Sequence, residues 1–304
     1  MTYSIVARDD ASGQLGVACE SHFFAPGAAV TWALPGIGAI ATQAFIDGRY
    51  GGTGMSMLAG GATAAEILGK LTAEDPHPEV RQVGLVGVSG DAASWTGSSC
   101  IAAAGGLVDG PVAVQGNMLE DTSVLPAMIE AYHRSDGDLA ERLMCAMEAA
   151  EAAGGDIRGS QGAALLVVGG DAALDPWNHK PVDLRVDDHP EPIGELRRLL
   201  GYRRAFDAVS GTMFAPGLMV GPYREPRAGD RDRALAALAA AAQVMIGNPE
   251  ADFWRGILLA RSGDLAGARD QLAAALAANP RLATFLDRLA AAGFLNHDDV
   301  VKLR

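Results

Sequence analysis

The sequence predicts an α+β fold, with two antiparallel sheets and a helical layer, followed by a small all-α region. Strand-like runs come in groups separated by helical stretches, which does not fit a sheet built from alternating βαβ units. From residue 193 the composition changes to helix rich in Arg, Leu and Ala. A pattern then recurs between Gly229 and Gly263, 34 residues apart (263 − 229), which predicts a helical repeat.

The chain opens with a predicted β-hairpin: a strand at residues 2–8, a turn rich in Asp, Ser and Gly, and a strand at residues 15–19. A Met followed by a small residue is normally trimmed after synthesis, and removal of Met1 would give Thr2 a free α-amino group. An amine of pKa about 7.7–8.0 beside a hydroxyl supplies a base and a nucleophile on one residue. The alternative is that Thr2 simply begins an ordinary edge strand.

The bounds of the next elements are predicted from Gly and Pro residues, which interrupt strands and helices. Short apolar runs predict strands at residues 28–33 and 36–43, and a Gly-rich lead at 50–54 is expected to be flexible. A helix with apolar residues at helical spacing follows at 62–71 and stops before the prolines at 75–78. The rest of the first part is predicted as strands at 81–88, 93–97 and 111–118, helices within 123–153 interrupted near 135–138, a loop at 154–162 and a buried strand at 163–168.

These patterns divide the chain into a first domain at 1–194, a helix and Pro/Gly-rich connection at 195–228, and a helical region at 229–304. Around Ala268 the small residues stand at the spacing of a tetratricopeptide repeat, and a final helix is expected at 282–295. The alternative is an Ala-rich helical hairpin with accidental similarity. The residues that support the repeat are Asp230, Ala234 and Leu238, which recur as Asp264, Ala268 and Leu272, together with Gly256, Ala275 and Pro280.

Composition bounds the function. The 304 residues are 49% hydrophobic and 20% charged, which is typical of a globular protein with a sizeable core. Residues 1–194 carry 9 Lys and Arg against 25 Asp and Glu, a balance of 9 − 25 = −16, and this disfavours a nucleic-acid partner. The three cysteines lack disulfide or metal-ligand spacing, and no signal peptide or membrane-spanning run is recognisable. We therefore expect a cytoplasmic protein without a membrane partner.

Polar residues at strand ends are the candidates for chemistry. The tripeptide Gln115-Gly116-Asn117 combines a glycine that permits close approach with an amide that can donate to an oxyanion, although a simple turn gives the same pattern. The loop containing Asp156 and Arg158 could bind a carboxylate or form an internal ion pair.

The histidines and the acidic run near them have alternative structural interpretations. His22 follows the second strand and is either a base or a packed histidine. The run Asp187-Asp188-His189 has metal-ligand residue types, but contiguous residues of an extended segment do not all face one ion. Neither a phosphate-binding loop of Walker type nor a dinucleotide fingerprint occurs. We expect neither a metal nor a cofactor.

Several motifs of the first domain are recognisable when they are taken together. They are residues 2–9 (TYSIVARD), 16–18 (GVA), 21–24 (SHFF), 38–43 (GAIATQ), 81–82 (RQ), 115–119 (QGNML), 140–143 (AERL), 154–161 (GGDIRGSQ) and 186–189 (VDDH). With these motifs the chain resembles the bacterial and archaeal domain-of-unknown-function family 1028 across roughly residues 1–200. That family is similar in fold to the N-terminal-nucleophile (Ntn) hydrolases, so the resemblance implies a four-layer αββα sandwich. Some of its members carry a C-terminal module resembling a peptidoglycan-binding domain, which this chain replaces with the repeat-like helices.

The resemblance also implies roles for particular residues. Thr2 would be the nucleophile, with Gly116 and Asn117 as oxyanion donors. Glu20 and His22 would lie beside Thr2 as further catalytic residues. The residues expected to bind substrate or orient the terminus are Ser21, Gln43, Gln115, Asp156, Arg158 and Gln161.

The leading hypothesis is therefore an amidohydrolase that cleaves a small amide or a short peptide. A rival is a non-catalytic Ntn-like scaffold protein whose C-terminal repeats bind a protein partner. A peptidoglycan-fragment hydrolase is a third possibility and rests on the family association alone. A homodimer is the default expectation for oligomeric state.

Overall fold

The computed structural model describes residues 2–173 and 179–303. The chain forms two compact units, one up to Leu199 and one from Leu200 onward. Helix α5 (Pro192–Met213) contributes residues to both units. Within the described ranges, no helix combines the length and apolar character that crossing a bilayer requires.

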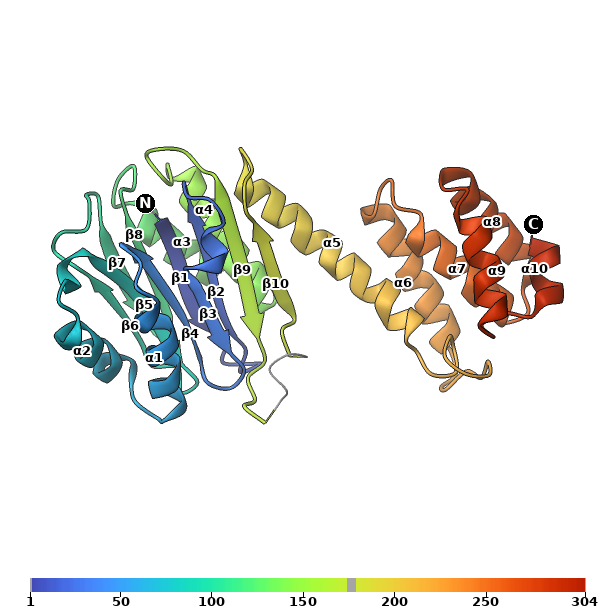
Figure 1. The fold of residues 1–304 in the computed structure, drawn as a ribbon, viewed down its shortest axis with the longest axis horizontal. Coiled ribbons are helices and arrows are strands. Elements are labelled where there is room, and N and C mark those ends of the chain that lie inside the picture. The colour runs from blue at the N-terminus through green and yellow to red at the C-terminus, as the bar shows by residue number, and fades with distance from the viewer. Residues whose placement is uncertain (1, 174–178, 304) are drawn as a thin grey trace. The chain divides into compact units, whose positions relative to one another are not determined.

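The first unit contains a six-stranded antiparallel sheet in which β1 (Thr2–Arg8) is a central strand. β1 lies between β2 (Leu15–Ser21) and β8 (Val112–Asn117), so Thr2 does not begin an edge strand (Figure 1). The remaining strands extend this sheet in the order β10-β9-β2-β1-β8-β7, with β7 at Gly105–Asp109, β9 at Gly162–Val168 and β10 at Val182–Val186.

A second, four-stranded antiparallel sheet faces the first. Its order is β3-β4-β5-β6. Across the interface between the sheets, β4 contacts β1 and β2, and β5 contacts β1 and β8. Small and branched side chains fill this interface, among them Val6, Val17 and Ala41. The strands are β3 (Thr31–Leu34), β4 (Gly38–Ala44), β5 (Arg81–Gly87) and β6 (Ala92–Thr96).

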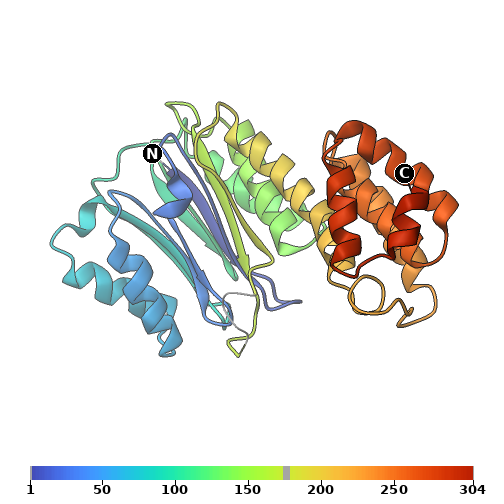
Figure 2. The ribbon, with the colours of Figure 1, turned by 45° about the vertical axis from the view of Figure 1, so that its right-hand side comes forward.

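Helices cover the outer faces of the two sheets, as the view in Figure 2 shows. α1 (Gly48–Ala59) and α2 (Ala64–Glu74) pack on the four-stranded sheet around Ile40, Ile67 and Leu85. α3 (Val124–Arg134) and α4 (Leu139–Ala152) pack on the six-stranded sheet. The prediction of a mixed α+β unit with two antiparallel sheets and separate helices is confirmed.

Residues 50–54, which were expected to form a flexible Gly-rich lead, lie inside α1, so that prediction was wrong. Asp47 caps the helix by accepting a hydrogen bond from the backbone N–H of Arg49 at 2.9 Å. Gly51 is required because a Cβ at that position would lie 2.2 Å from the Trp32 ring. Glycine therefore serves close packing here, and the cap and the packing outweigh its low helix propensity.

Other boundaries also moved. The strand expected at 28–33 begins only at Thr31, because a short 3-10 helix occupies Pro26–Ala28. Strands β7 and β10 were not singled out, since β7 is largely exposed and both lack a buried apolar run.

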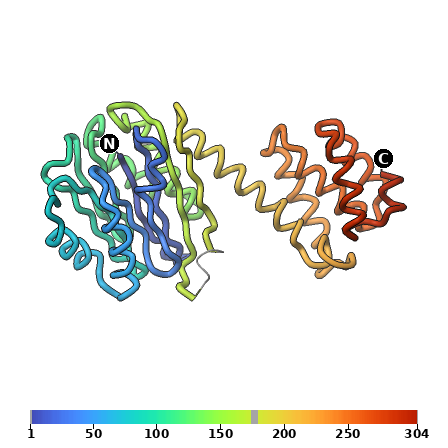
Figure 3. Tube along the Cα trace, viewed as in Figure 1, coloured from blue at the N-terminus to red at the C-terminus, as the bar shows by residue number. Residues whose placement is uncertain are grey.

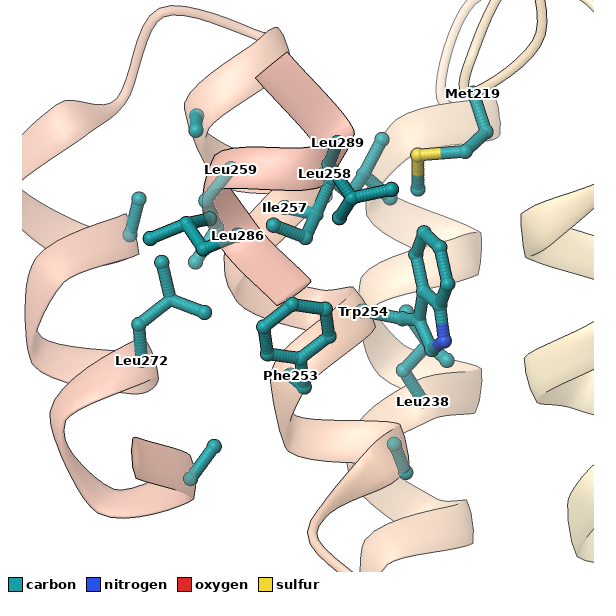
Figure 4. Close-up of a cluster of buried hydrophobic side chains, with 14 of the residues drawn as sticks. Met219, Leu238, Phe253, Trp254, Ile257, Leu258, Leu259, Leu272, Leu286 and Leu289 are labelled. Atoms are coloured by element: carbon teal, nitrogen blue, oxygen red, sulfur yellow. The ribbon is translucent and has the colours of Figure 1, made fainter. Parts of the chain in front are cut away.

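The helices of the C-terminal unit pack around an interior that is mainly apolar and that includes one buried polar side chain among the described residues, Thr212. Phe253 lies on the side of its helix that faces Leu272 and Leu286, whereas the Trp254 ring lies on the other side, beside Leu238 and Met219 (Figure 4). The described helices are α6 (Asp230–Val244), α7 (Glu250–Arg261), α8 (Leu265–Ala278), α9 (Leu282–Ala291) and α10 (His297–Leu303).

Several positions of the predicted repeat have a clear structural role. Gly229 and Gly263 both adopt the left-handed region, with φ of 82° and 91°, just before α6 and α8. Gly256 lies where α7 crosses α8, and a Cβ there would be 2.6 Å from Leu272 Cγ. The final helix ends at Ala291 rather than 295, and α10 was not expected.

Candidate functional site

Thr2 lies at the end of the six-stranded sheet where the chain begins, marked N in Figure 3. It pairs with Asn117 of β8, and its Oγ1 donates to Ser21 Oγ of β2 at 3.0 Å. Thr2 is 5% exposed. The sheet thus brings three of the predicted site residues, Thr2, Ser21 and Asn117, into one group.

The side chains of two glutamines and one asparagine meet next to the Thr2 carbonyl, between the two sheets. The Thr2 carbonyl accepts from Gln43 Nε2 at 2.9 Å and from Asn117 Nδ2 at 3.5 Å. Gln82 Oε1 accepts from both of those amides at 2.8 Å. Gln82 in turn donates to the Gly116 carbonyl at 2.7 Å. Gln82 therefore holds in place the side-chain amides of Gln43 and Asn117, which both bond to the Thr2 carbonyl.

Ser4 extends the amide network one residue pair further into the sheet interface. Its hydroxyl donates to Gln43 Oε1 and accepts from Gln115 Nε2, each at 2.5 Å. Gly84 leaves the room that Gln115 occupies, because a Cβ there would lie 1.9 Å from Gln115 Oε1. Gln43 and Gln115 are fully buried and bonded within the network, which is a positioning arrangement rather than a surface for substrate.

Gln82 was not among the predicted site residues. The sequence does contain the Arg81-Gln82 pair, at the start of β5 opposite Gln43 of β4. Its significance depends on the facing of two sheets, which local patterns do not reveal. The signal that the sequence did offer was a glutamine at the end of one predicted strand, Gln43, and another near the start of a later one, Gln82.

Glu20 does not join this group. It pairs with Tyr3 on the neighbouring strand, and alternation along a strand places both side chains on the face opposite Thr2. There Tyr3 donates its hydroxyl to Glu151 Oε2 at 2.5 Å. Burial, reinforced by the nearby carboxylates of Glu151 and Asp156, raises the pKa of Glu20 to about 9, so it is protonated at neutral pH.

Asp156 and Arg158 form the internal ion pair that the sequence left open. Arg158 Nη2 lies 3.2 Å from Asp156 Oδ2, and the same carboxylate accepts from the backbone N–H of His22 at 3.0 Å. The backbone of Asp156 also forms an isolated antiparallel β-bridge with Leu119, just after β8. The loop thereby ties the ends of β2 and β8 together, while the His22 side chain itself is exposed.

The Gln161 side chain bonds to an aspartate, and Gly116 is a paired residue in the middle of the sheet. Gln161 Nε2 donates to Asp188 Oδ1 at 3.1 Å. Gly116 pairs with Tyr3 and Gly105, and a Cβ there would lie 2.8 Å from the Leu119 side chain. Among the described residues, no group of three or more His, Cys, Asp or Glu side chains is placed to hold a metal ion.

A small cavity opens next to Asn117, at the ends of β4 and β8. It has a volume of about 120 Å³. Exposed apolar side chains gather at the same strand ends, following β2 and β4, preceding β7 and in the loop before β9. The cavity is lined by Ala44, Phe45, Cys100, Ile101, Asn117 and Met118, and the exposed apolar residues are Phe23, Phe24, Phe45, Ile46, Ile101 and Ile157.

Comparisons with known proteins agree with the predicted family. The model of a family of unknown function, DUF1028, matches residues 2–196. Among solved structures, the chain is similar to protein SPO2555 from Silicibacter pomeroyi, whose crystal structure is described under the same family. The two are 33% identical with a TM-score of 0.59, over 66% of this chain and 87% of that chain. A search of curated proteins finds no match.

Proposed function

We propose that this chain, which belongs to the family of unknown function DUF1028, is an N-terminal-nucleophile amidohydrolase acting through Thr2. The observation that carries the proposal is the placement of Thr2 at the start of a central strand, with its hydroxyl 3.0 Å from Ser21 Oγ and its strand partner Asn117 alongside. Two facing antiparallel sheets with helices outside both support a sandwich of the Ntn type. Met1, whose removal the reaction requires, lies outside the described residues.

The reaction begins with proton transfer from Thr2 Oγ1 to the Thr2 α-amine as Oγ1 attacks the substrate carbonyl carbon. The tetrahedral intermediate breaks its C–N bond, and the amine leaving group takes the proton. This leaves an ester between the acyl group and Thr2. Water then attacks the ester carbonyl carbon and gives a proton to the α-amine. The bond between the acyl carbon and Thr2 Oγ1 breaks, the α-amine returns the proton to Oγ1, and the carboxylic acid is released. No metal or redox partner enters this balance.

Oxyanion stabilisation in this proposal comes from Asn117. Its Nδ2 makes one short bond to Gln82 and one contact of 3.5 Å to the Thr2 carbonyl, at the long limit for a hydrogen bond. A developing negative charge is a stronger acceptor than a distant carbonyl, so the second N–H would turn to it. Gln82 holds the amide while this occurs.

The experiment has two parts. The intact mass of the purified protein should be lower by one methionine, and a panel of small neutral amides and dipeptides should yield a substrate. Thr2→Ala should then lose activity by about 10³-fold or more while Thr2→Ser retains part of it, because only the serine keeps a hydroxyl. Full activity in Thr2→Ala would remove Thr2 from the mechanism.

One observation favours a second candidate, a non-catalytic scaffold of the same fold. Thr2 is 5% exposed and both its carbonyl and the Asn117 amide are already hydrogen-bonded. In that proposal the C-terminal helices recruit a protein partner. Retention of Met1, together with no turnover across the amide panel, would support the scaffold over the enzyme.

Assembly and location belong to the same proposal. We take the enzyme to be a cytoplasmic homodimer, and a mass measurement in solution tests the dimer directly.

A further inference from the structure

The cavity beside Asn117 is formed where β4 and β8 end. Ala44 and Phe45 come from the end of β4, and Met118 follows the last residue of β8. The segment before β7 closes the cavity, and it is fixed there because Met118 N–H donates to the Ile101 carbonyl at 2.9 Å. The cavity is therefore part of the same strand ends that position Thr2.

Two of its lining residues have an unusual backbone. Ala44 and Met118 lie in the left-handed region, with φ of 65° and 51°. A residue with a Cβ is disfavoured there, at a cost of roughly 1–3 kcal/mol in such sites. Ala25 is the one other non-glycine residue with positive φ in the described parts of the chain. Backbone strain of this kind concentrates where a local shape is needed for binding or catalysis.

The lining chemistry is apolar. Its lining side chains are uncharged, and the two that carry a polar group are Asn117 and Cys100, whose thiol is directed to the Arg81 carbonyl at 3.4 Å. The Asn117 amide contacts the Thr2 carbonyl at 3.5 Å, so the cavity begins one side chain away from the proposed nucleophile. A charged group would enter this space without a partner and would lose its hydration.

Size limits the occupant further. A cavity of about 150 Å³ holds one benzene molecule, so 120 Å³ corresponds to about four or five carbon atoms. This is the volume of an isobutyl or isopropyl group rather than of an aromatic ring or a sugar.

We propose that this cavity binds a short, uncharged, branched aliphatic group of the substrate, on the acyl side of the amide. The selectivity for aliphatic acyl amides rests on the proposed function, since the acyl group becomes attached to Thr2. Binding of the aliphatic group is a property of the cavity alone.

Cys100 provides a readout that needs no turnover. It lines the cavity, whereas Cys145 lies on α4 beside Glu141 and Arg197 and serves as an internal control with similar partial exposure. Burial raises the pKa of the Cys100 thiol, so alkylation by iodoacetamide is followed at alkaline pH, with mass spectrometry of the two cysteine peptides. The measurement is made on the full-length Thr2→Ala protein, so that the probe is not consumed.

The probe is isovaleramide, compared with acetamide, which is smaller, and with succinamate, which is charged. A ligand of this size is expected to bind with a Kd on the order of 1–10 mM. At roughly ten times that concentration, alkylation of Cys100 should slow several-fold while Cys145 is unaffected, and succinamate should protect neither. Equal slowing of both cysteines, equal protection by succinamate, or no protection of Cys100 would each overturn the proposal.

A pair of exposed isoleucines sharpens the test. Ile101 lines the cavity and is 52% exposed, while Ile157 is 60% exposed and does not line it. Ile101→Ala should shift the best protection of Cys100 from isovaleramide to the larger phenylacetamide, and Ile157→Ala should leave the order unchanged. An unchanged order in Ile101→Ala would contradict the assignment of the cavity.

The outcomes separate the two proposals. Protection of Cys100 without any amide turnover in the native protein would retain the cavity assignment and remove the hydrolase. Turnover that depends on Thr2, with no protection of Cys100, would retain the hydrolase and remove the cavity assignment.

Discussion

The two units of this chain bury different kinds of side chain. In the N-terminal unit, Ser4, Gln43, Gln82, Gln115 and Asn117 are all buried and bonded to one another. Among the described residues of the C-terminal unit, Thr212 is the one buried polar side chain, and the rest of its interior is apolar.

The two kinds of interior serve different purposes: the apolar core mainly stabilises the fold, and the amide network mainly positions side chains. An apolar core gains free energy roughly in proportion to the area it removes from water. A buried amide network gains little net free energy, but it holds its members in one arrangement and is costly when incomplete. In the N-terminal unit, the side chains held in one arrangement are therefore those around the candidate nucleophile, Thr2.

The largest effect is expected from the C-terminal unit. Phe253 is fully buried, stacks on Phe285 with ring centroids 5.4 Å apart and packs edge-on to Trp254. Phe253→Ala should lower the free energy of unfolding of this unit by about 3–5 kcal/mol through lost burial and a new cavity. Hydrogen exchange read by segment would show faster exchange in α7 and α8 and unchanged exchange in β1 and β2. Equal acceleration in both units would mean that they do not have separate cores.

A substitution in the amide network is expected to lower the free energy of unfolding by less than Phe253→Ala does, but to lower activity by more. Gln82→Leu keeps the volume but removes the acceptor of Gln43 and Asn117 and the donor to Gly116. Leaving those buried groups unpaired should cost about 2–3 kcal/mol in denaturant unfolding. If Gln82 positions the Asn117 amide, kcat should fall far more than KM rises.

The conservative variant distinguishes positioning from folding. Gln82→Glu retains an acceptor for both amides, so part of the kcat should return even where stability does not. A variant series in which kcat tracks stability alone would argue against a positioning role.

A third effect depends on pH. The folded-state pKa of Glu20, about 9, exceeds its unfolded value, so the folded state holds a proton that the unfolded state releases. This group's contribution is favourable below the unfolded pKa, and stability falls as pH rises from about 4.5 to 9. Glu20→Gln should abolish that slope and stabilise the protein at pH 8 by an amount on the order of a few kcal/mol. Unfolding titrations at pH 4.5, 6.5 and 8.5 would measure it, and parallel curves would contradict the protonated state.

The sequence predicted those features that depend on local patterns. The alternation in residues 2–8 and 15–19 correctly located the first hairpin, and the turn at 135–138 correctly separated α3 from α4. Local patterns also selected Thr2 and Asn117, the family resemblance added Ser21, and the sheet brings these three residues together. Local patterns do not determine which sheet faces which, and this explains why Gln82 was missed and Glu20 was placed beside Thr2.

Glycine was the least predictable residue, because its role depends on what lies next to it. Gly51 and Gly52 are neighbours in α1, yet only Gly51 faces Trp32, while a Cβ at Gly52 would meet no atom within 4 Å. The difference between needed and dispensable glycine is thus set by the helix face, which the sequence alone did not reveal.

The smallest expected effect tests this pair directly. Gly52→Ala should stabilise the protein by about 0.5–1 kcal/mol, since alanine loses less backbone entropy in a helix than glycine does. Gly51→Ala should instead destabilise it by about 1–3 kcal/mol, because its Cβ would lie 2.2 Å from the Trp32 ring and force that ring to move. Thermal and denaturant unfolding of the two variants measure both values, and Trp32 fluorescence should shift only in Gly51→Ala. If Gly52→Ala were also destabilising, residues 50–54 would be the flexible lead that the sequence first indicated, and the wall that α1 provides beside the four-stranded sheet would be less rigid than the structure has it.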